Sequence, residues 1–312
     1  MRLVGLLTGT VVLVVAVLAA ALVRGADRPA GSGTAWSSGL GPGPAAAPPS
    51  ATGNPPSAAA PPTRAAPSSP AARPGAAAPA RFGTVRAGAA LPSGSQCAAW
   101  VRAKPFAENK GGNRKANATT GHRIAADFFS GGDPRANSRI GSRVDGQFTG
   151  TTRQILRWAA CKWGIDEDLV YAQAAIESWW QQGTLGDWTT DASRCAPGRG
   201  LGVDGRAGQC PESFGILQNR YPYERSGWPG IASSTAMNAD LGYAIWRTCF
   251  EGYETWLNTV ERGRDYAAGD AWGCIGRWFS GRWHTAAAEQ YIGRVRGYLD
   301  QRIWQTRDFQ QP

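Results

Sequence analysis

The sequence predicts a mainly α-helical domain with a loop-rich insert that includes a small β-element. Two observations lead to this fold class. Apolar residues recur at helical spacing in several segments between residues 151 and 304, and a stretch rich in Gly, Asp and Thr, 181–215, separates them. A third observation limits the domain, because residues 25–92 offer little that builds a core.

The N-terminal segment predicts a membrane anchor or a signal peptide. A run with almost no polar residues extends from Leu3 to Val23, between Arg2 and Arg24. About 20 apolar residues span a bilayer, whereas the apolar part of a signal peptide is typically shorter. The length favours a single-pass anchor over residues 1–24, and small residues at 19–21 leave cleavage open. In either case we expect the rest of the chain to be exported.

Composition divides the rest of the chain. Residues 25–92 are mostly Ala, Pro, Gly and Ser, which predicts a disordered linker that holds a folded domain away from the membrane. Residues 93–150 have a mixed composition and are expected to pack on the main domain as an extension, with a short helix at Ile124–Phe129. The main domain is expected at 151–305 and a C-terminal tail at 306–312.

The six cysteines predict disulfides, since their number is even and the chain is expected to be exported. Six cysteines allow 15 pairings, of which we expect Cys97–Cys161, Cys195–Cys210 and Cys249–Cys274. The chain has no CxxC pair and only two histidines. We therefore expect no metal site and no cofactor.

Helix signals follow one another through the main domain. Thr151 and Gln154 fit a capping box, and the helix that they begin should end at Gly164. Ser233 or Ser234 is placed to cap a long helix from about 235 to 258. The segment 271–283 is dense in Trp and Gly. A last helix, from about 285 to 304, carries an inner face of Tyr291, Val295, Leu299 and Ile303.

The central feature is the segment 165–180, IDEDLVYAQAAIESWW. Asp166 suits a helix N-cap, and the helix after it is apolar on almost every side, which is typical of a buried helix. Glu177 nevertheless lies inside it, with no Lys or Arg between Lys162 and Arg194. A carboxyl group in apolar surroundings without a cation should have a raised pKa, as a general acid needs. The alternative is a glutamate at the helix end that faces water.

The order of three motifs resembles the lysozyme-like superfamily, in particular the soluble lytic transglycosylase and goose-type lysozyme domains. The first motif is the Glu177-Ser178 helix end, and the second is Phe214-Gly215-Ile216-Leu217-Gln218. The third is weaker: a helix with Asn238 that leads to Trp278-Phe279-Ser280-Gly281, where the family has Tyr-Asn-x-Gly. The resemblance covers about residues 150–305. It extends to exported bacterial cell-wall proteins and implies an α+β lysozyme-like fold.

The resemblance also implies an enzyme that cleaves the β-1,4 bond between N-acetylmuramic acid and N-acetylglucosamine in peptidoglycan. Glu177 would be the general acid and base of a lytic transglycosylase. A hydrolytic lysozyme of the inverting type needs a second carboxylate, for which Asp187, Asp191, Asp204 and Glu212 are the candidates. A third possibility is an inactive protein that only binds peptidoglycan, which the altered third motif and the long linker favour.

The expected substrate-binding residues lie near these motifs. Gln218 is expected to bond a sugar or Glu177, or to act as a structural amide, and Gly215 to allow close approach of backbone to a sugar. Ser178 is expected to orient the helix end or Glu177. The chain has 14 Trp, and aromatic side chains suit the flat apolar faces of sugars. The five near the motifs are Trp179, Trp180, Trp188, Trp278 and Trp283; of these, the candidates for substrate binding are Trp179, Trp278 and Trp283.

The positive charge lies outside the expected catalytic part. Residues 1–92 carry seven Arg and one Asp, and residues 93–150 carry nine basic and four acidic residues, whereas residues 151–312 carry 17 basic and 18 acidic ones. A basic exported segment fits anionic lipid or wall polymers, or a solvated linker. We expect peptidoglycan glycan strands and, through residues 3–23, a membrane as partners, with no nucleic acid and a monomeric chain. The domain would lie outside the cell membrane, or in the cell wall after cleavage.

Overall fold

The computed structural model describes residues 79–310. The predicted anchor over 1–24 and the linker residues 25–78 lie outside this range. Within residues 79–310, no helix has both the length and the apolar character that a membrane span requires.

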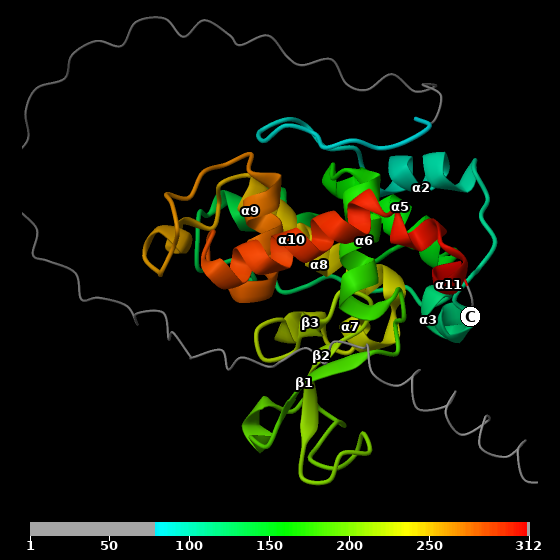
Figure 1. The fold of residues 1–312 in the computed structure, drawn as a ribbon, viewed down its shortest axis with the longest axis vertical. Helices are drawn as coiled ribbons and strands as arrows, with labels where there is room; N and C mark the ends of the chain where they lie inside the picture. Colours follow the sequence, from blue (N-terminus) through cyan, green and yellow to red (C-terminus); the bar gives the residue numbers. More distant parts are fainter. Residues whose placement is uncertain (1–78, 311–312) are drawn as a thin grey trace, which may run out of the picture. The chain divides into compact units, whose positions relative to one another are not determined.

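The five longest helices lie at the centre of the described fold, and its helical character confirms the mainly α-helical prediction (Figure 1). They are α5 (Thr152–Trp163), α6 (Glu167–Ser178), α8 (Thr235–Phe250), α9 (Ala271–Ser280) and α10 (Ala286–Asp300). Helix α5 packs on α6 and α8, while α10 packs on α6 and α9. The core between them is rich in aromatic side chains, including the fully buried Trp158, Trp163 and Trp246.

The helix ends follow the signals in the sequence. Thr151 and Gln154 form both hydrogen bonds of a capping box, and Gly164 ends α5 in the left-handed conformation. Asp166 caps α6 by accepting hydrogen bonds from the backbone N–H groups of residues 168 and 169. Ser234 caps α8 through the N–H of Met237.

Two helix predictions need correction. Helix α8 stops at Phe250 rather than near 258, because Gly252 has a φ of 81° that an α-helix excludes; a 3-10 helix, η5 (Thr255–Asn258), follows. Residues 124–129 form no helix, and only 126–129 form turns. There the N–H of Phe129 bonds to the side chain of Asn137 instead of a helical carbonyl.

The insert contains the expected β-element as a three-stranded antiparallel sheet. Its strands are β1 (Leu185–Thr189), β2 (Cys210–Phe214) and β3 (Asn219–Arg220), in the order β1-β2-β3. In the register of β1 and β2, Gly186 lies opposite Ser213 and Thr189 opposite Cys210. The Cys195–Cys210 disulfide closes the loop between these strands, which extends away from the helices (Figure 1).

The linker prediction was wrong at its C-terminal end, because residues 79–92 pack on the domain. This segment, here called the strap, is drawn in cyan near α2 in Figure 1. Phe82 is buried, and its backbone bonds in both directions with Glu167. Arg247 donates hydrogen bonds to the carbonyls of Val85 and Arg86. The buried Arg247 thus holds the backbone of a segment whose composition alone predicts no structure.

Residues 93–150 contact the main helices through α2, which packs on α5, and α3, which packs on α8. They form α2 (Gly94–Arg102), α3 (Arg114–Asn117) and α4 (Arg135–Arg139), with the 3-10 turns η1 (Gly111–Asn113) and η2 (Gly141–Arg143). The predicted C-terminal tail is also packed rather than free: α11 (Arg307–Gln310) buries Phe309 against Trp179 and Trp180. The shorter elements are η3 (Ala192–Arg194), η4 (Arg225–Gly227), α7 (Gly230–Ser233) and η6 (Ile303–Gln305).

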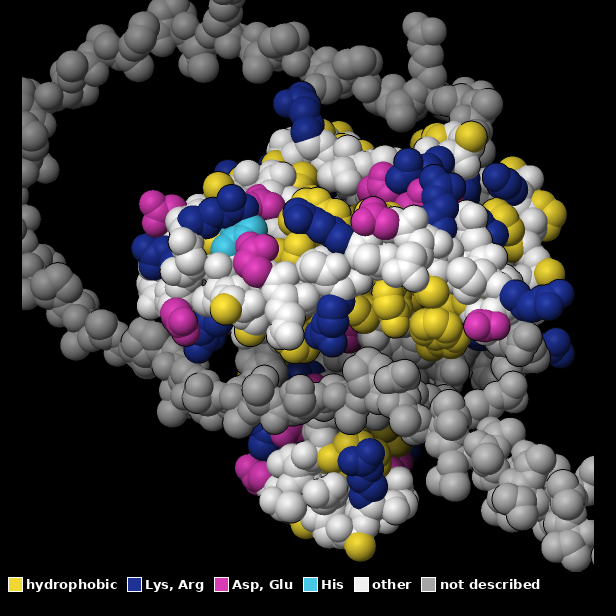
Figure 2. Space-filling model, in the orientation of Figure 1, with side chains coloured by type: hydrophobic (Ala, Val, Ile, Leu, Met, Phe, Trp, Pro, Cys, Tyr) yellow, Lys and Arg dark blue, Asp and Glu magenta, His cyan; other side chains and the backbone are white. Residues whose placement is uncertain are grey.

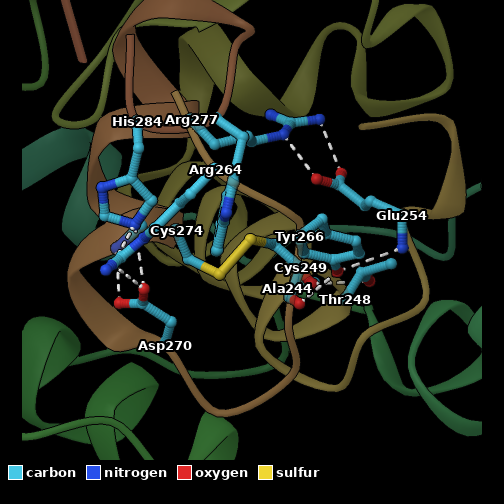
Figure 3. The surroundings of a disulfide bond; sticks show 12 residues. Ala244, Thr248, Cys249, Glu254, Arg264, Tyr266, Asp270, Cys274, Arg277 and His284 are labelled. Carbon is cyan, nitrogen blue, oxygen red and sulfur yellow. Dashed lines mark hydrogen bonds and ion pairs between the residues drawn. A yellow bond between two sulfur atoms is a disulfide. The ribbon is translucent and has the colours of Figure 1, made fainter. Parts of the chain in front are cut away.

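All three predicted disulfides are confirmed: Cys97–Cys161, Cys195–Cys210 and Cys249–Cys274. The first ties α2 to α5, and the third ties α8 to α9. Figure 3 shows the third, with the bidentate ion pair of Arg277 and Glu254 beside it. Since Cys274 and Trp278 lie one turn apart on α9, this bridge also fixes the position of Trp278.

Candidate active site around Glu177

Glu177 lies at the C-terminal end of α6, where the chain leaves the helix abruptly. Ser178 is the last helical residue, and Trp179 and Trp180 have φ values of 57° and 62°. Two successive left-handed non-glycine residues are unusual and carry strain, which persists only where the surroundings enforce it. Here the buried Trp180 enforces it, because its indole N–H donates to the carbonyl of Tyr171.

Glu177 is half-buried as a residue, and its carboxyl has a strongly altered acidity. Burial among apolar groups raises its pKa to about 7, with the carboxyl of Asp187 acting in the same direction. Hydrogen bonds from Tyr291 and Trp278 and the charge of Arg294 act in the opposite direction. The side chain therefore holds a proton for much of the time at neutral pH.

Tyr291 holds this carboxyl in place from α10. Its hydroxyl donates a hydrogen bond to Oε1 of Glu177, and burial places its own pKa well above the usual range. The ring stacks on Phe279 of α9, with centroids 4.8 Å apart and planes 4° from parallel. Two helices that pack on each other thus fix one hydrogen-bond donor against the end of α6.

The second motif, residues 214–218, is fixed to the end of α6 by buried amides. Ser178 donates from Oγ to the carbonyl of Ile216 at 2.8 Å, which agrees with its expected role in orienting the helix end. Asn238 of α8 accepts from the N–H of Leu217 and donates to the carbonyl of Phe214. Gln182 accepts from the N–H of Ile216.

Gly215 and Gln218 both have structural roles in this loop. Gly215 is buried with a φ of 82°, and a Cβ there would lie 2.2 Å from Nδ2 of Asn238. The close approach that requires glycine is thus made by a protein amide. Gln218 donates from Nε2 to the carbonyls of Thr184 and Gly215. These bonds fit the alternative in which Gln218 is a structural amide.

The four candidate second carboxylates differ in their partners and in their exposure. Glu212 is buried and forms ion pairs with Arg194 and Arg220, and Asp204 pairs with Arg199. Asp191 accepts hydrogen bonds at the start of η3. Asp187 also forms an ion pair with Arg220 at 3.4 Å. It differs from the other three because it is exposed on β1, has a φ of 47° and lies close enough to Glu177 to raise the pKa of that carboxyl.

The tryptophans near the motifs have different environments. Trp278 is half-buried and contacts Glu177, so it keeps a place at the site. Trp179 is half-buried against Tyr298 and Phe309. Trp283 is 0% exposed and donates its indole N–H to the carbonyl of Asp265. The expectation that Trp283 contacts a substrate is therefore wrong, because a core residue offers no face to a ligand.

Two residues of the site were not singled out by sequence reasoning. Tyr291 was counted only among the inner positions of the last helix, where a lone hydroxyl among apolar residues was the available signal. Arg294, one turn further along α10, affects Glu177 electrostatically. Both lie more than 100 residues from Glu177 in the chain, so local sequence could not connect them to it.

Two surface hollows of about 240 and 260 Å³ lie elsewhere, the first between Glu108 and Thr151 and the second under the strap at Phe82. Glu177 lines neither of them. Within residues 79–310, no group of His, Cys, Asp and Glu side chains is arranged to hold a metal ion.

No family model, no curated protein and no solved structure matches this chain.

Proposed function

We propose that the chain cleaves the β-1,4 bond between N-acetylmuramic acid and N-acetylglucosamine in peptidoglycan, as a lytic transglycosylase. The observation that carries the proposal is the half-buried Glu177, whose carboxyl has a pKa raised to about 7. A general acid works best when its pKa is close to the working pH. The order of the Glu-Ser and Gly-Ile-Leu-Gln motifs supports the choice of substrate.

The proposed reaction uses one carboxyl group twice. Protonated Glu177 gives its proton to the glycosidic oxygen as the bond from that oxygen to the anomeric carbon breaks. The muramoyl 6-hydroxyl then attacks the anomeric carbon, and its proton passes to the Glu177 carboxylate. This closes a 1,6-anhydro ring and returns Glu177 to its starting state. Tyr291 and Trp278 would steady the carboxylate that exists between the two steps.

Asp187 supports a second candidate, a hydrolytic lysozyme that acts on the same bond. In an inverting hydrolase the two carboxyl groups lie about 6.5–9.5 Å apart and the second activates water. Asp187 fits this role better than the other three acids, since it is exposed on the sheet and influences Glu177. Its carboxyl also accepts a hydrogen bond from Ser213, which would fix its direction.

The three disulfides support export to an oxidising compartment. With the apolar run at residues 3–23, they support a domain held outside the cell membrane. The strap affects how the protein should be prepared. A fragment that begins at residue 91 would lose the contacts of Phe82 and Val85, so tests belong on the full chain.

The experiment compares the purified full chain with Glu177→Gln on cell-wall suspensions. The wild type should lower the turbidity, and the variant should lose at least about 100-fold in rate, the usual contribution of a general acid. Mass analysis of the fragments then separates the two reactions, because 1,6-anhydro ends mark a transglycosylase and reducing ends a hydrolase. Equal activity of both proteins would reject Glu177 as the catalyst. Binding without turnover in both would favour a peptidoglycan-binding protein.

A further inference from the structure

Arg294 is a charged residue of the Glu177 site to which the proposed reaction assigns no role. It lies on α10 one turn after Tyr291, and its side chain is exposed. The centre of its guanidinium group lies 5.3 Å from the ring centroid of Phe279 and 5.4 Å from that of Tyr291. The two stacked rings beside Glu177 thus hold a cation at the surface.

No acidic residue among those described neutralises this cation. Many other arginines of the described chain form an ion pair with an acidic residue, as Arg277 does with Glu254 and Arg247 does with Glu251. Arg294 forms no ion pair within residues 79–310, and the nearest acid along α10, Glu289, bonds to His284. Its charge is nevertheless close enough to Glu177 to lower the pKa of that carboxyl.

The surroundings of Arg294 fit an anion that arrives with the ligand. An arginine that lies on aromatic rings has a direction fixed by packing, which favours a bidentate contact with a carboxylate over a freely moving surface charge. Figure 2 shows the face on which α10 lies, where Lys and Arg side chains stand beside hydrophobic groups. A neutral glycan offers hydroxyl and amide oxygens as hydrogen-bond acceptors but no negative charge to pair with such a cation.

We propose that Arg294 binds a carboxylate carried by the sugar strand next to the bond that is cleaved, and so selects anionic glycans over neutral ones. The inference rests on the proposed function and adds a specificity-determining residue to it. In the proposed substrate the carboxylate has two sources. One is the lactyl group on the muramoyl sugar, which is free when the stem peptide has been removed, and the other is the stem peptide itself.

The test measures binding, so it does not depend on turnover. Full chains with Glu177→Gln, alone and combined with Arg294→Gln, are sedimented with three insoluble glycans at fixed salt. The glycans are intact peptidoglycan, peptidoglycan stripped of its peptides with the lactyl carboxylates free, and the stripped material with those carboxylates converted to methylamides. Arg296→Gln is the matched control, because Arg296 is exposed on the same helix, lies over the Trp272 ring at 4.5 Å and has no ion pair among the described residues.

Arg294→Gln should raise the Kd about tenfold on an anionic glycan, while Arg296→Gln should leave it unchanged. The Kd of the neutralised glycan should be the same with and without Arg294. A difference on the stripped glycan assigns the lactyl carboxylate, and a difference on intact material alone assigns the peptide. An equal loss on charged and neutralised glycans, or no loss on any, would overturn the proposal. Inactive wild type with Arg294-dependent binding would instead reject only the enzymatic function.

Discussion

The hydroxyl of Tyr291 donates a hydrogen bond to the carboxyl of Glu177 across 114 residues of sequence. It joins the end of α6 to the middle of α10, and the stacking of Tyr291 on Phe279 brings α9 into the same arrangement. Three helices therefore determine the surroundings of one carboxyl group. The acidity of that carboxyl therefore depends on tertiary packing.

The rate of wall cleavage should fall as the pH rises through about 7. Burial raises the pKa of Glu177 to about 7, and only the protonated form serves as the general acid. The measurement is the rate of fragment release between pH 4 and pH 9 at constant ionic strength. A descending limb that begins near pH 5, as for an ordinary exposed glutamate, would contradict the raised pKa.

Tyr291→Phe should move this descending limb to higher pH. The hydrogen bond from Tyr291 stabilises ionised Glu177, so its loss favours the protonated form. A hydrogen bond to a charged group contributes about 1.5–3 kcal/mol, which is enough for a shift of about one pH unit. Tyr298→Phe is the matched control, because Tyr298 lies on the same helix and packs on Trp179. A limb that moves equally in both variants would show a general effect of loosening α10.

The helix that carries Glu177 could be predicted from sequence because its signals are local. Asp166 caps it, and its apolar faces and the missing cations between Lys162 and Arg194 indicate burial. The site partners could not be predicted in this way. The hydroxyl of Tyr291 reaches Glu177 only after α10 packs on α6, and nothing in the periodicity of α10 separates this residue from Val295.

Other errors have the same physical origin. Trp283 lies close to a motif in sequence, yet its side chain is completely buried and its indole N–H donates to the carbonyl of Asp265. Its backbone forms an isolated β-bridge with Arg262. The strap has a composition that predicts disorder, but Arg157 and Arg247 supply hydrogen bonds to its backbone. Such contacts depend on charged side chains whose directions are set by distant elements.

Glu177→Gln should stabilise the folded protein above pH 7 and have little effect at pH 4. A carboxyl whose pKa is raised on folding favours the folded state while protonated, and this contribution is lost as the pH rises through the folded pKa. The rise of the pKa from 4.5 to about 7 corresponds to roughly 3 kcal/mol for the fully ionised group. Glu224, whose pKa burial raises to about 8, acts in the same direction in both proteins and cancels in their difference. Urea unfolding at pH 4 and pH 8 measures the difference in free energy of unfolding between the wild type and Glu177→Gln. If this difference were the same at both pH values, it would contradict burial of the Glu177 charge.

Removal of the Cys249–Cys274 disulfide should lower both stability and activity. The bridge closes a 25-residue separation between α8 and α9, and chain entropy assigns it about 3–4 kcal/mol. It also holds Trp278 near Glu177. The Cys195→Ala/Cys210→Ala pair is the control, since its 15-residue separation gives a similar stability loss of about 3 kcal/mol in a loop between strands. Unfolding and cleavage rates of both double variants should show a larger activity loss for the α8–α9 bridge, and equal losses would count against a role for α9.

Gly215→Ala should destabilise the protein by about 2–4 kcal/mol. A methyl group there meets a φ of 82° and would lie 2.2 Å from Nδ2 of Asn238 and 2.6 Å from Nε2 of Gln182. Both amides would have to leave the loop that Ser178 ties to the end of α6. Gly208→Ala isolates the backbone term, because Gly208 has a φ of 66° with no atom within 4 Å of an added Cβ, and it should cost only about 1 kcal/mol. If thermal unfolding showed equal losses for the two variants, the amides would not be the reason for glycine at position 215.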